Sequence, residues 1–406
     1  MIHNTRRNAI AIVIISALGY FVDIYDLILF SIVRIVSLKS LGITENDLIT
    51  DGVLLLNMQM AGMLIGGIIW GILGDKKGRI SVLFGSIILY SLANIGNGFV
   101  QNIPQYAFLR LIAGIGLAGE LGAGITLVSE VMTPKTRGYG TMIVATIGIL
   151  GAVVAALVGD LFNWRIAYFV GGGLGLILLV LRITVYESGM YASIRNLNIS
   201  KGNFLKLFTR YDLFIRYINS ILIGVPIWFI VGILITFSPE FGREFGIAET
   251  ISAGKAVMFC YIGLATGDFL SGTISQLIKS RKKVILIFIS LELVFILIYL
   301  FFNHNQILLY VLCFLLGISG GYWAVFVTNA AEQFGTNIRA TVTTTVPNFV
   351  RGAVVPITLM FEYLRNFVSL KYSALIIGLL TITLAYLSAI SLKETYGKNL
   401  DYVETD

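Results

Sequence analysis

Twelve long runs of apolar residues, separated by short polar segments, organise this chain of 406 residues. An α-helix needs about 20 predominantly apolar residues to cross the hydrocarbon core of a membrane. The runs therefore predict twelve transmembrane helices, at residues 9–36, 52–73, 80–100, 105–132, 138–160, 165–187, 214–240, 251–279, 284–302, 307–333, 339–362 and 371–391. An even number of spans places both ends of the chain on the same side of the membrane.

The basic residues between the runs give this arrangement an orientation. Nineteen lysines and arginines fall on the face that holds the two ends of the chain, and six fall on the opposite face. Cytoplasmic loops of membrane proteins carry such an excess of basic residues. Both termini are therefore predicted to be cytoplasmic.

The composition agrees with a membrane protein and excludes several other classes. Hydrophobic residues make up 57% of the chain and charged residues 13%, whereas soluble domains carry about 25% charged residues. The net charge of +7 is explained by the cytoplasmic loops, so it does not predict a nucleic-acid partner. The two cysteines lie inside apolar runs and the two histidines outside them, which predicts no metal site or cofactor. No phosphate-binding loop is present, and nothing predicts an enzyme.

The two halves of the chain look related to each other. The longest polar connection, 188–213, separates an N-terminal six-helix bundle, 1–187, from a C-terminal six-helix bundle with a short cytoplasmic tail, 214–406. A Glu and an Arg seven residues apart end the fourth run, at Glu130 and Arg137, and recur 202 residues later at Glu332 and Arg339. Because these residues recur at one offset, close to half the length of the chain, they favour two pseudo-symmetric bundles.

A charged turn between the second and third runs points to a family. The segment Gly71-Ile-Leu-Gly-Asp75-Lys-Lys-Gly78-Arg79 must lie at a membrane face, because charges are costly inside lipid. It resembles the signature loop between helices 2 and 3 of the major facilitator superfamily, although Ile80 replaces the usual second basic residue. The resemblance implies two six-helix bundles that alternate between inward-open and outward-open states.

Other motifs resemble one branch of that superfamily. The run Arg110-Leu-Ile-Ala-Gly-Ile-Gly-Leu-Ala-Gly-Glu120 is similar to the R-x-x-x-G-x-G-x-x-G-E run of metabolite:proton symporters. The tail Glu394-Thr-Tyr-Gly-Lys398 resembles their P-E-T-x-G-K/R ending, with Lys393 in place of the proline. Sugar porters and aromatic-acid symporters share much of this pattern, so the resemblance implies a symporter of this general type.

The resemblance also implies a cytoplasmic gate. Asp75 is expected to interact with donors at a neighbouring helix start, and Arg79 and Arg137 are expected to pair with Glu130. In the second half, pairs among Glu332, Arg339 and the basic segment 279–283 would act in the same way. The expected gate residues are Gly71, Asp75, Gly78, Arg79, Glu130, Arg137, Glu332 and Arg339.

Two carboxylates in the first run are candidates for proton coupling. Asp23 and Asp26 share one helical face at a spacing of three. Two ionised carboxylates at low dielectric repel each other, so we expect one of them to hold a proton. By the resemblance, Asp26 and Arg110 match the helix 1 aspartate and helix 4 arginine of proton-coupled sugar porters. Depths of about 15 and about 9 Å from the outer end, at 1.5 Å per residue, would let them meet. The alternative is a permanent structural ion pair.

Further charges lie inside the apolar runs. Glu120 is either a second titrating group, a substrate anchor or a buried structural carboxylate. Arg351 lies near mid-depth between two prolines and suits a carboxylate substrate. Its alternative is an ion pair with Asp268. Glu292 lies on an expected peripheral helix and is given no role.

Five aromatic residues are expected to line the cavity by analogy with the family. They are Tyr20, Tyr25, Trp228, Tyr322 and Trp323. For any one of them, packing between helices is the alternative.

These features predict an all-α, multi-pass protein of the bacterial inner membrane. We expect a monomeric secondary transporter that imports a small polar or anionic metabolite (organic acid, amino acid or osmolyte) with protons by alternating access. Its partners would be the metabolite, protons and the lipid bilayer. The alternative is a proton-driven exporter of drugs or siderophores, but Arg110 and Arg351 favour anions or zwitterions over lipophilic cations.

Overall fold

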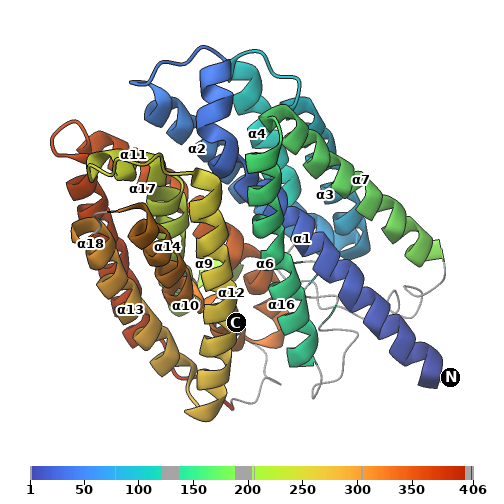
Figure 1. The fold of residues 1–406 in the computed structure, drawn as a ribbon. Helices are drawn as coiled ribbons and strands as arrows, with labels where there is room; N and C mark the ends of the chain where they lie inside the picture. Colours follow the sequence, from blue (N-terminus) through green and yellow to red (C-terminus); the bar gives the residue numbers. More distant parts are fainter. Residues whose placement is uncertain are drawn as a thin grey trace.

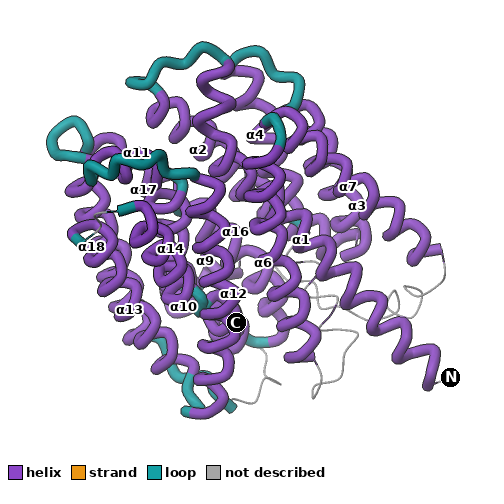
Figure 2. Tube along the Cα trace, viewed as in Figure 1, coloured by secondary structure: helices purple, strands orange, loops and turns teal. Residues whose placement is uncertain are grey.

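The computed structural model describes residues 2–77, 79–120, 122, 124, 128, 137–187, 204, 206–302, 305–397 and 404. In this part of the chain all regular secondary structure is helical (Figure 2). The helices of the N-terminal half are α1 (Ile2–Ser40), α2 (Leu48–Lys77), α3 (Arg79–Asn97), α4 (Ile103–Leu117), α6 (Arg137–Leu161) and α7 (Trp164–Glu187).

The helices of the C-terminal half are more often interrupted. They are α9 (Lys206–Thr209), α10 (Tyr211–Phe229), the π-helical segment η1 (Ile230–Ile235), α11 (Ser238–Glu244), α12 (Ala253–Leu277), α13 (Arg281–Phe301), α14 (Gln306–Gly320), α15 (Trp323–Glu332), α16 (Thr336–Gly352), α17 (Val354–Leu364) and α18 (Leu370–Ser391). The predicted runs 214–240, 307–333 and 339–362 therefore each contain a break or a π-helical segment.

One of these breaks follows directly from a proline. Pro356 has no N–H to donate, so the carbonyl of Gly352, four residues earlier, loses its helical partner. Helix α16 ends at Gly352 and α17 begins at Val354. The interruption lies between Pro347 and Pro356, close to Arg351.

Nine helices in the described part of the chain are long and apolar enough to cross a membrane, and the apolar helices Ser81–Asn97 and Ile103–Leu117 are shorter. The run predicted at 339–362 is not among the nine. Its first part, α16, is rich in polar residues that face the interior, including Thr344, Thr345 and Asn348, each at most 5% exposed. Low hydropathy in this helix reflects interior polar contacts.

Glycines bring two pairs of helices unusually close, and the two pairs correspond. A Cβ on Gly62 of α2 would meet the backbone of α4 at Leu111, and a Cβ on Gly263 of α12 would meet the backbone of α14 at Phe314. Close approach of this kind is available only to residues without a side chain. Gly62 and Gly263 are 201 residues apart, nearly the offset that separates the repeated Glu and Arg pairs.

Figure 1 shows α1–α7 on one side of the molecule and most of α10–α18 on the other. The two groups meet where α6 and α1 pack against α12, and where α2 packs against α16 and α17. Helix α1 ends beside Glu240 of α11, whereas Arg216, near the start of α10, contacts Glu404 of the tail. We call the end that holds Glu240 the far end and the end that holds Glu404 the tail end.

Candidate functional site

A small cavity lies at the centre of the molecule, between the two groups of helices. Its volume of about 30 Å³ has room for roughly two water molecules. It is lined by Tyr20, Ile24, Ile149, Ile227, Trp228, Val231, Tyr261, Leu264, Trp323 and Arg351. Four aromatic rings and one arginine therefore line a small cavity whose walls come from both halves of the chain.

Arg351 forms its ion pair with Asp23 of α1. Nη1 of Arg351 lies 3.7 Å from Oδ2 of Asp23, and the two side chains are 1% and 0% exposed. The guanidinium carbon also lies 5.9 Å from the centre of the Trp228 ring, a separation that permits a cation–π interaction. The pair joins the N-terminal and C-terminal halves at the cavity wall.

The expected alternative, a pair between Arg351 and Asp268, is wrong for this structure. Oδ1 of Asp268 accepts a hydrogen bond of 3.0 Å from the backbone N–H of Ala324, in the first turn of α15. The start of a helix has unpaired N–H groups and favours negative charge. Asp268 therefore stabilises the restart of the broken helix that carries Trp323.

Asp26 and Arg110 do not form the expected ion pair in the described part of the chain. Arg110 donates a hydrogen bond to the side chain of Gln59, and its guanidinium lies 4.3 Å from the centre of the Phe30 ring. Asp26 is fully buried, close to the Asn94 amide. Asp26 and Arg110 therefore lie in one region of the protein, but the contacts of the Arg110 guanidinium are with Gln59 and Phe30.

Glu120 is held by an arginine that sequence reasoning missed. Nη1 of Arg182, on α7, donates a 3.0 Å hydrogen bond to Oε2 of Glu120, and both side chains are at most 2% exposed. Arg182 also donates to the carbonyl of Leu83. The available signal was a cation inside the apolar run 165–187, which is rare in membrane helices and usually has a partner.

The expected aromatic residues divide into two groups. Trp228, Trp323 and Tyr20 line the cavity, as predicted. Tyr25 and Tyr322 do not, because their hydroxyls donate to the carbonyls of Ala167 and Ile223 inside the helix packing.

The positions of Tyr261 and Glu292 also differ from what the sequence predicts. Tyr261 lines the cavity although sequence reasoning did not select it. Glu292, assigned to a peripheral helix, is fully buried and lies 3.4 Å from the Tyr322 hydroxyl.

The tail end contains part of the expected gate. Glu332 lies 3.6 Å from Arg281 and accepts a 2.7 Å hydrogen bond from Thr395. Arg339 donates to the carbonyls of Ala331 and Phe334. Gly71 lies within α2. Gly78, Glu130 and the side chains of Asp75, Arg79 and Arg137 lie outside the described residues.

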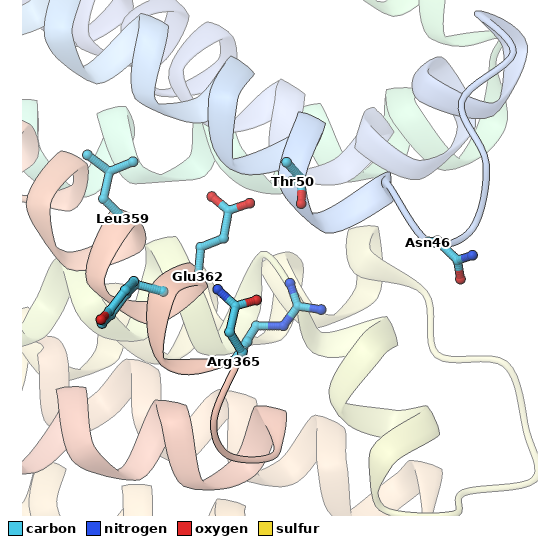
Figure 3. A pocket seen from close by; sticks show the side chains of 7 residues that line it. Asn46, Thr50, Leu359, Glu362 and Arg365 are labelled. Carbon is cyan, nitrogen blue, oxygen red and sulfur yellow. The ribbon is translucent and has the colours of Figure 1, made fainter.

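A second, larger pocket opens at the far end. It has a volume of about 470 Å³ and is lined by Asn46, Thr50, Leu359, Glu362, Tyr363, Arg365 and Asn366. Thr50 of α2 and Glu362 of α17 project toward each other from the two halves of the chain (Figure 3). This pocket, like the central cavity, is therefore lined by residues of both halves of the chain.

Comparison with known proteins agrees with this architecture. The sequence profile of the Major Facilitator Superfamily matches residues 14–357. A putative metabolite transport protein of Haemophilus influenzae is 27% identical over 354 residues, which cover 83% of this chain and 84% of that protein. A probable 4-methylmuconolactone transporter of Cupriavidus pinatubonensis is 25% identical over 342 residues, which cover 80% of this chain and 76% of that protein.

A solved structure extends the comparison to the fold. The crystal structure of a D-xylose-proton symporter superimposes with a TM-score of 0.72, covering 96% of this chain and 99% of that one at 17% identity. The similarity extends over nearly the whole of both chains and shows a shared fold.

Proposed function

The chain belongs to the Major Facilitator Superfamily, a family of membrane transporters, and on this basis we propose that it imports a small carboxylate together with protons by alternating access. The observation that carries the proposal is the ion pair between Asp23 and Arg351. It joins the two halves at a cavity lined by aromatic rings. A pair in this position can link a proton, a substrate anion and the relative position of the halves.

The proposed topology has twelve spans in two six-helix bundles, 1–187 and 214–406, with both termini in the cytoplasm of a bacterial cell. The corresponding glycine contacts at Gly62 and Gly263 support the repeat. The excess of basic residues on the terminal face supports the orientation. The far end then faces outward, and the protein acts as a monomer in the inner membrane.

The chemistry of the cavity supports a planar carboxylate as substrate. Arg351 can present two parallel N–H groups to a carboxylate, and the rings of Trp228 and Trp323 provide flat apolar surfaces beside it. Relatives with shorter matches are named for niacin and benzoate, both from Acinetobacter baylyi and 29% and 28% identical over 44% of this chain. Together with the 4-methylmuconolactone relative, these names favour small, flat, oxygen-rich metabolites.

The proposed coupling follows from charge balance. While Asp23 is ionised, it is the counter-ion of Arg351 and competes with any substrate anion. A proton on Asp23 removes this competitor, so Arg351 can bind the substrate carboxylate. The loaded pair then has the same net charge as the empty pair, and a site without excess charge can pass between states at a smaller desolvation cost.

The proposal is tested with purified protein in liposomes that have an acidic exterior and a neutral interior. Nicotinate and cis,cis-muconate are the probes, nicotinamide is the uncharged control, and protein-free liposomes measure leakage. We expect accumulation of at least one acid, its loss when a protonophore removes the pH gradient, and no accumulation of nicotinamide. Equal uptake with and without the gradient would exclude proton coupling, and preferential movement of nicotinamide would exclude a carboxylate site.

A further inference from the structure

A second buried ion pair joins the two halves at the far end. Nη2 of Arg34, on α1, donates hydrogen bonds of 2.6 and 2.7 Å to the two carboxylate oxygens of Glu240, on α11. Arg34 is 0% exposed and Glu240 is 6% exposed. Neither residue was singled out from the sequence, and the proposed coupling at Asp23 does not use them.

The surroundings of Arg34 show a site built for this contact. The guanidinium donates to the carbonyls of Leu48 and Thr236 and lies 4.5 Å from the centre of the Phe237 ring. A Cβ on Gly52 of α2 would collide with the Arg34 side chain, so α2 leaves space for it. The hydroxyl of Thr236 also donates to Ser31 of α1, over 2.9 Å.

The ion pair lies near the far-end pocket, whose lining residues are drawn in Figure 3. Leu48, which accepts from Arg34, stands between the pocket residues Asn46 and Thr50 in the sequence. Glu240 lies within electrostatic range of Arg365, another pocket residue. The pair therefore lies beside the far-end pocket, at the contact between the two halves.

We infer that the Arg34–Glu240 pair is the latch that holds the far end of the transporter closed, and that the pocket at Glu362 and Arg365 is the mouth of the pathway above it. A substrate entering from the far end has to pass between α1 and α11, which the pair holds together. Only a contact that differs between two states can shift the balance between them.

The burial of the latch distinguishes it from other ion pairs at the far end. Arg243 of the C-terminal half pairs over 2.9 Å with Glu45, in the loop between α1 and α2, but the two side chains are 56% and 54% exposed. Arg243 also lies 3.9 Å from Glu240, so Glu45 is the member of this pair that can be changed without altering a contact of the buried pair. Exposed pairs of this kind contribute little to an equilibrium. Removing one partner of a buried pair leaves an uncompensated charge and has a large effect. The two pairs therefore form a matched comparison at one face of the molecule.

The experiment measures the separation of the halves without substrate or a proton gradient. Spin labels are attached at Gln101→Cys in the N-terminal half and Phe367→Cys in the C-terminal half, both exposed at the far end. The native Cys260 and Cys313 are replaced by serine. Distance distributions are compared for the parent protein, Glu240→Gln and the matched control Glu45→Gln.

We expect Glu240→Gln to shift the population toward longer distances, with the ratio of long to short distances rising at least about tenfold, as expected when a buried charge loses its partner. Glu45→Gln should leave the distribution close to that of the parent.

If Glu240→Gln does not fold, the double variant Arg34→Met/Glu240→Leu replaces it, because removing both charges avoids an unpaired one. An unchanged distribution in a folded variant that lacks the pair would overturn the inference, as would an equal shift in Glu45→Gln. The latch does not depend on the identity of the substrate. Liposomes that fail to accumulate carboxylates would count against the proposed function and leave this result standing.

Discussion

Asp23 of α1 and Arg351 of α16 form an ion pair at the wall of the central cavity, with 3.7 Å between Oδ2 and Nη1 and with both side chains withdrawn from solvent. Arg351, which lines the cavity, is thus paired with a carboxylate from the opposite half of the chain. Binding of a substrate anion and protonation of Asp23 are therefore linked, because each event changes the charge that Arg351 encounters.

The first prediction concerns Asp23→Asn. The amide cannot carry the transported proton, and it no longer competes with a substrate anion for Arg351. Accumulation driven by a pH gradient should be lost, while exchange of labelled for unlabelled substrate across preloaded liposomes should continue. Asp47→Asn, at an exposed loop carboxylate bonded to Thr44, is the control and should accumulate substrate normally. Full gradient-driven accumulation by Asp23→Asn would contradict this role.

The second prediction concerns Asp26→Asn. Asp26 is fully buried one turn from Asp23 and is not the counter-ion of Arg351, so a proton on Asp26 would add a charge that the substrate does not balance. We expect wild-type uptake of a monocarboxylate to respond both to the pH gradient and to a negative interior potential. Asp26→Asn should respond to the pH gradient alone. Potassium gradients with valinomycin set the potential, and an unchanged response to potential would remove Asp26 from the coupling.

The third prediction separates the binding role of Arg351 from its structural role. Arg351→Lys keeps the charge but loses the planar pair of donors, and Arg351→Gln loses both. Affinity for the carboxylate should fall in that order, measured by quenching of tryptophan fluorescence. Adding Asp23→Asn to Arg351→Gln removes the unpaired carboxylate, so thermal stability should recover while affinity stays low. Recovery of affinity in the double variant would show that Arg351 does not bind the substrate.

The sequence predicts where helices lie better than where they break. The predicted span 165–187 agrees closely with α7 at Trp164–Glu187, because a long apolar run bounded by polar residues has few alternatives in lipid. The π-helical segment Ile230–Ile235 has no such signature. Its residues are as apolar as their neighbours, and Pro226 marks only the general region.

The sequence identifies the buried arginines but not the carboxylates that pair with them. Nineteen basic residues on one loop face and six on the other leave four of the 29 lysines and arginines, Arg34, Arg110, Arg182 and Arg351. All four are fully buried in the structure. The sequence could therefore identify all four as interior cations. Their partners could not be assigned in this way. Asp268 was the one partner expected for Arg351, whereas the structure pairs this arginine with Asp23, and the choice depends on the rotation of each helix about its axis.

The fourth prediction concerns the Glu120–Arg182 pair. Removing one member of a buried pair costs about 3–5 kcal/mol because the other charge remains. Glu120→Gln and Arg182→Met should each lower the midpoint of thermal unfolding, and Glu120→Gln/Arg182→Met should recover much of the loss. If the pair is an anchor within the N-terminal half, the double variant should also keep proton-driven uptake. A folded double variant without coupling would instead place Glu120 in the proton pathway.

The fifth prediction concerns Glu394, which lies beyond the last helix and ties the tail to the start of α13. Burial by itself would raise the pKa of this carboxyl group, but hydrogen bonds from the Ser280 hydroxyl and from the backbone N–H groups of Tyr396, Arg281 and Thr395 outweigh it and hold the pKa below its ordinary value of 4.5. A carboxyl group with a lowered pKa in the folded state stabilises that state above the ordinary value. This stability is lost as the pH falls below 4.5 toward the lower, folded-state pKa.

Wild-type protein should therefore lose stability between about pH 5 and pH 3 in a way that Glu394→Gln does not. At pH 7 the variant should unfold at a temperature lower by about 1–2 °C, a small shift because the site is largely exposed and the chain is long. The measurement is thermal unfolding in detergent across this pH range, with hydrogen exchange of the α13 N-terminal amides as a local probe. The amides of Arg281 and Lys282, which donate to Glu394, should exchange faster in the variant at pH 7. Identical exchange in the two proteins would show that Glu394 does not hold the tail to this helix.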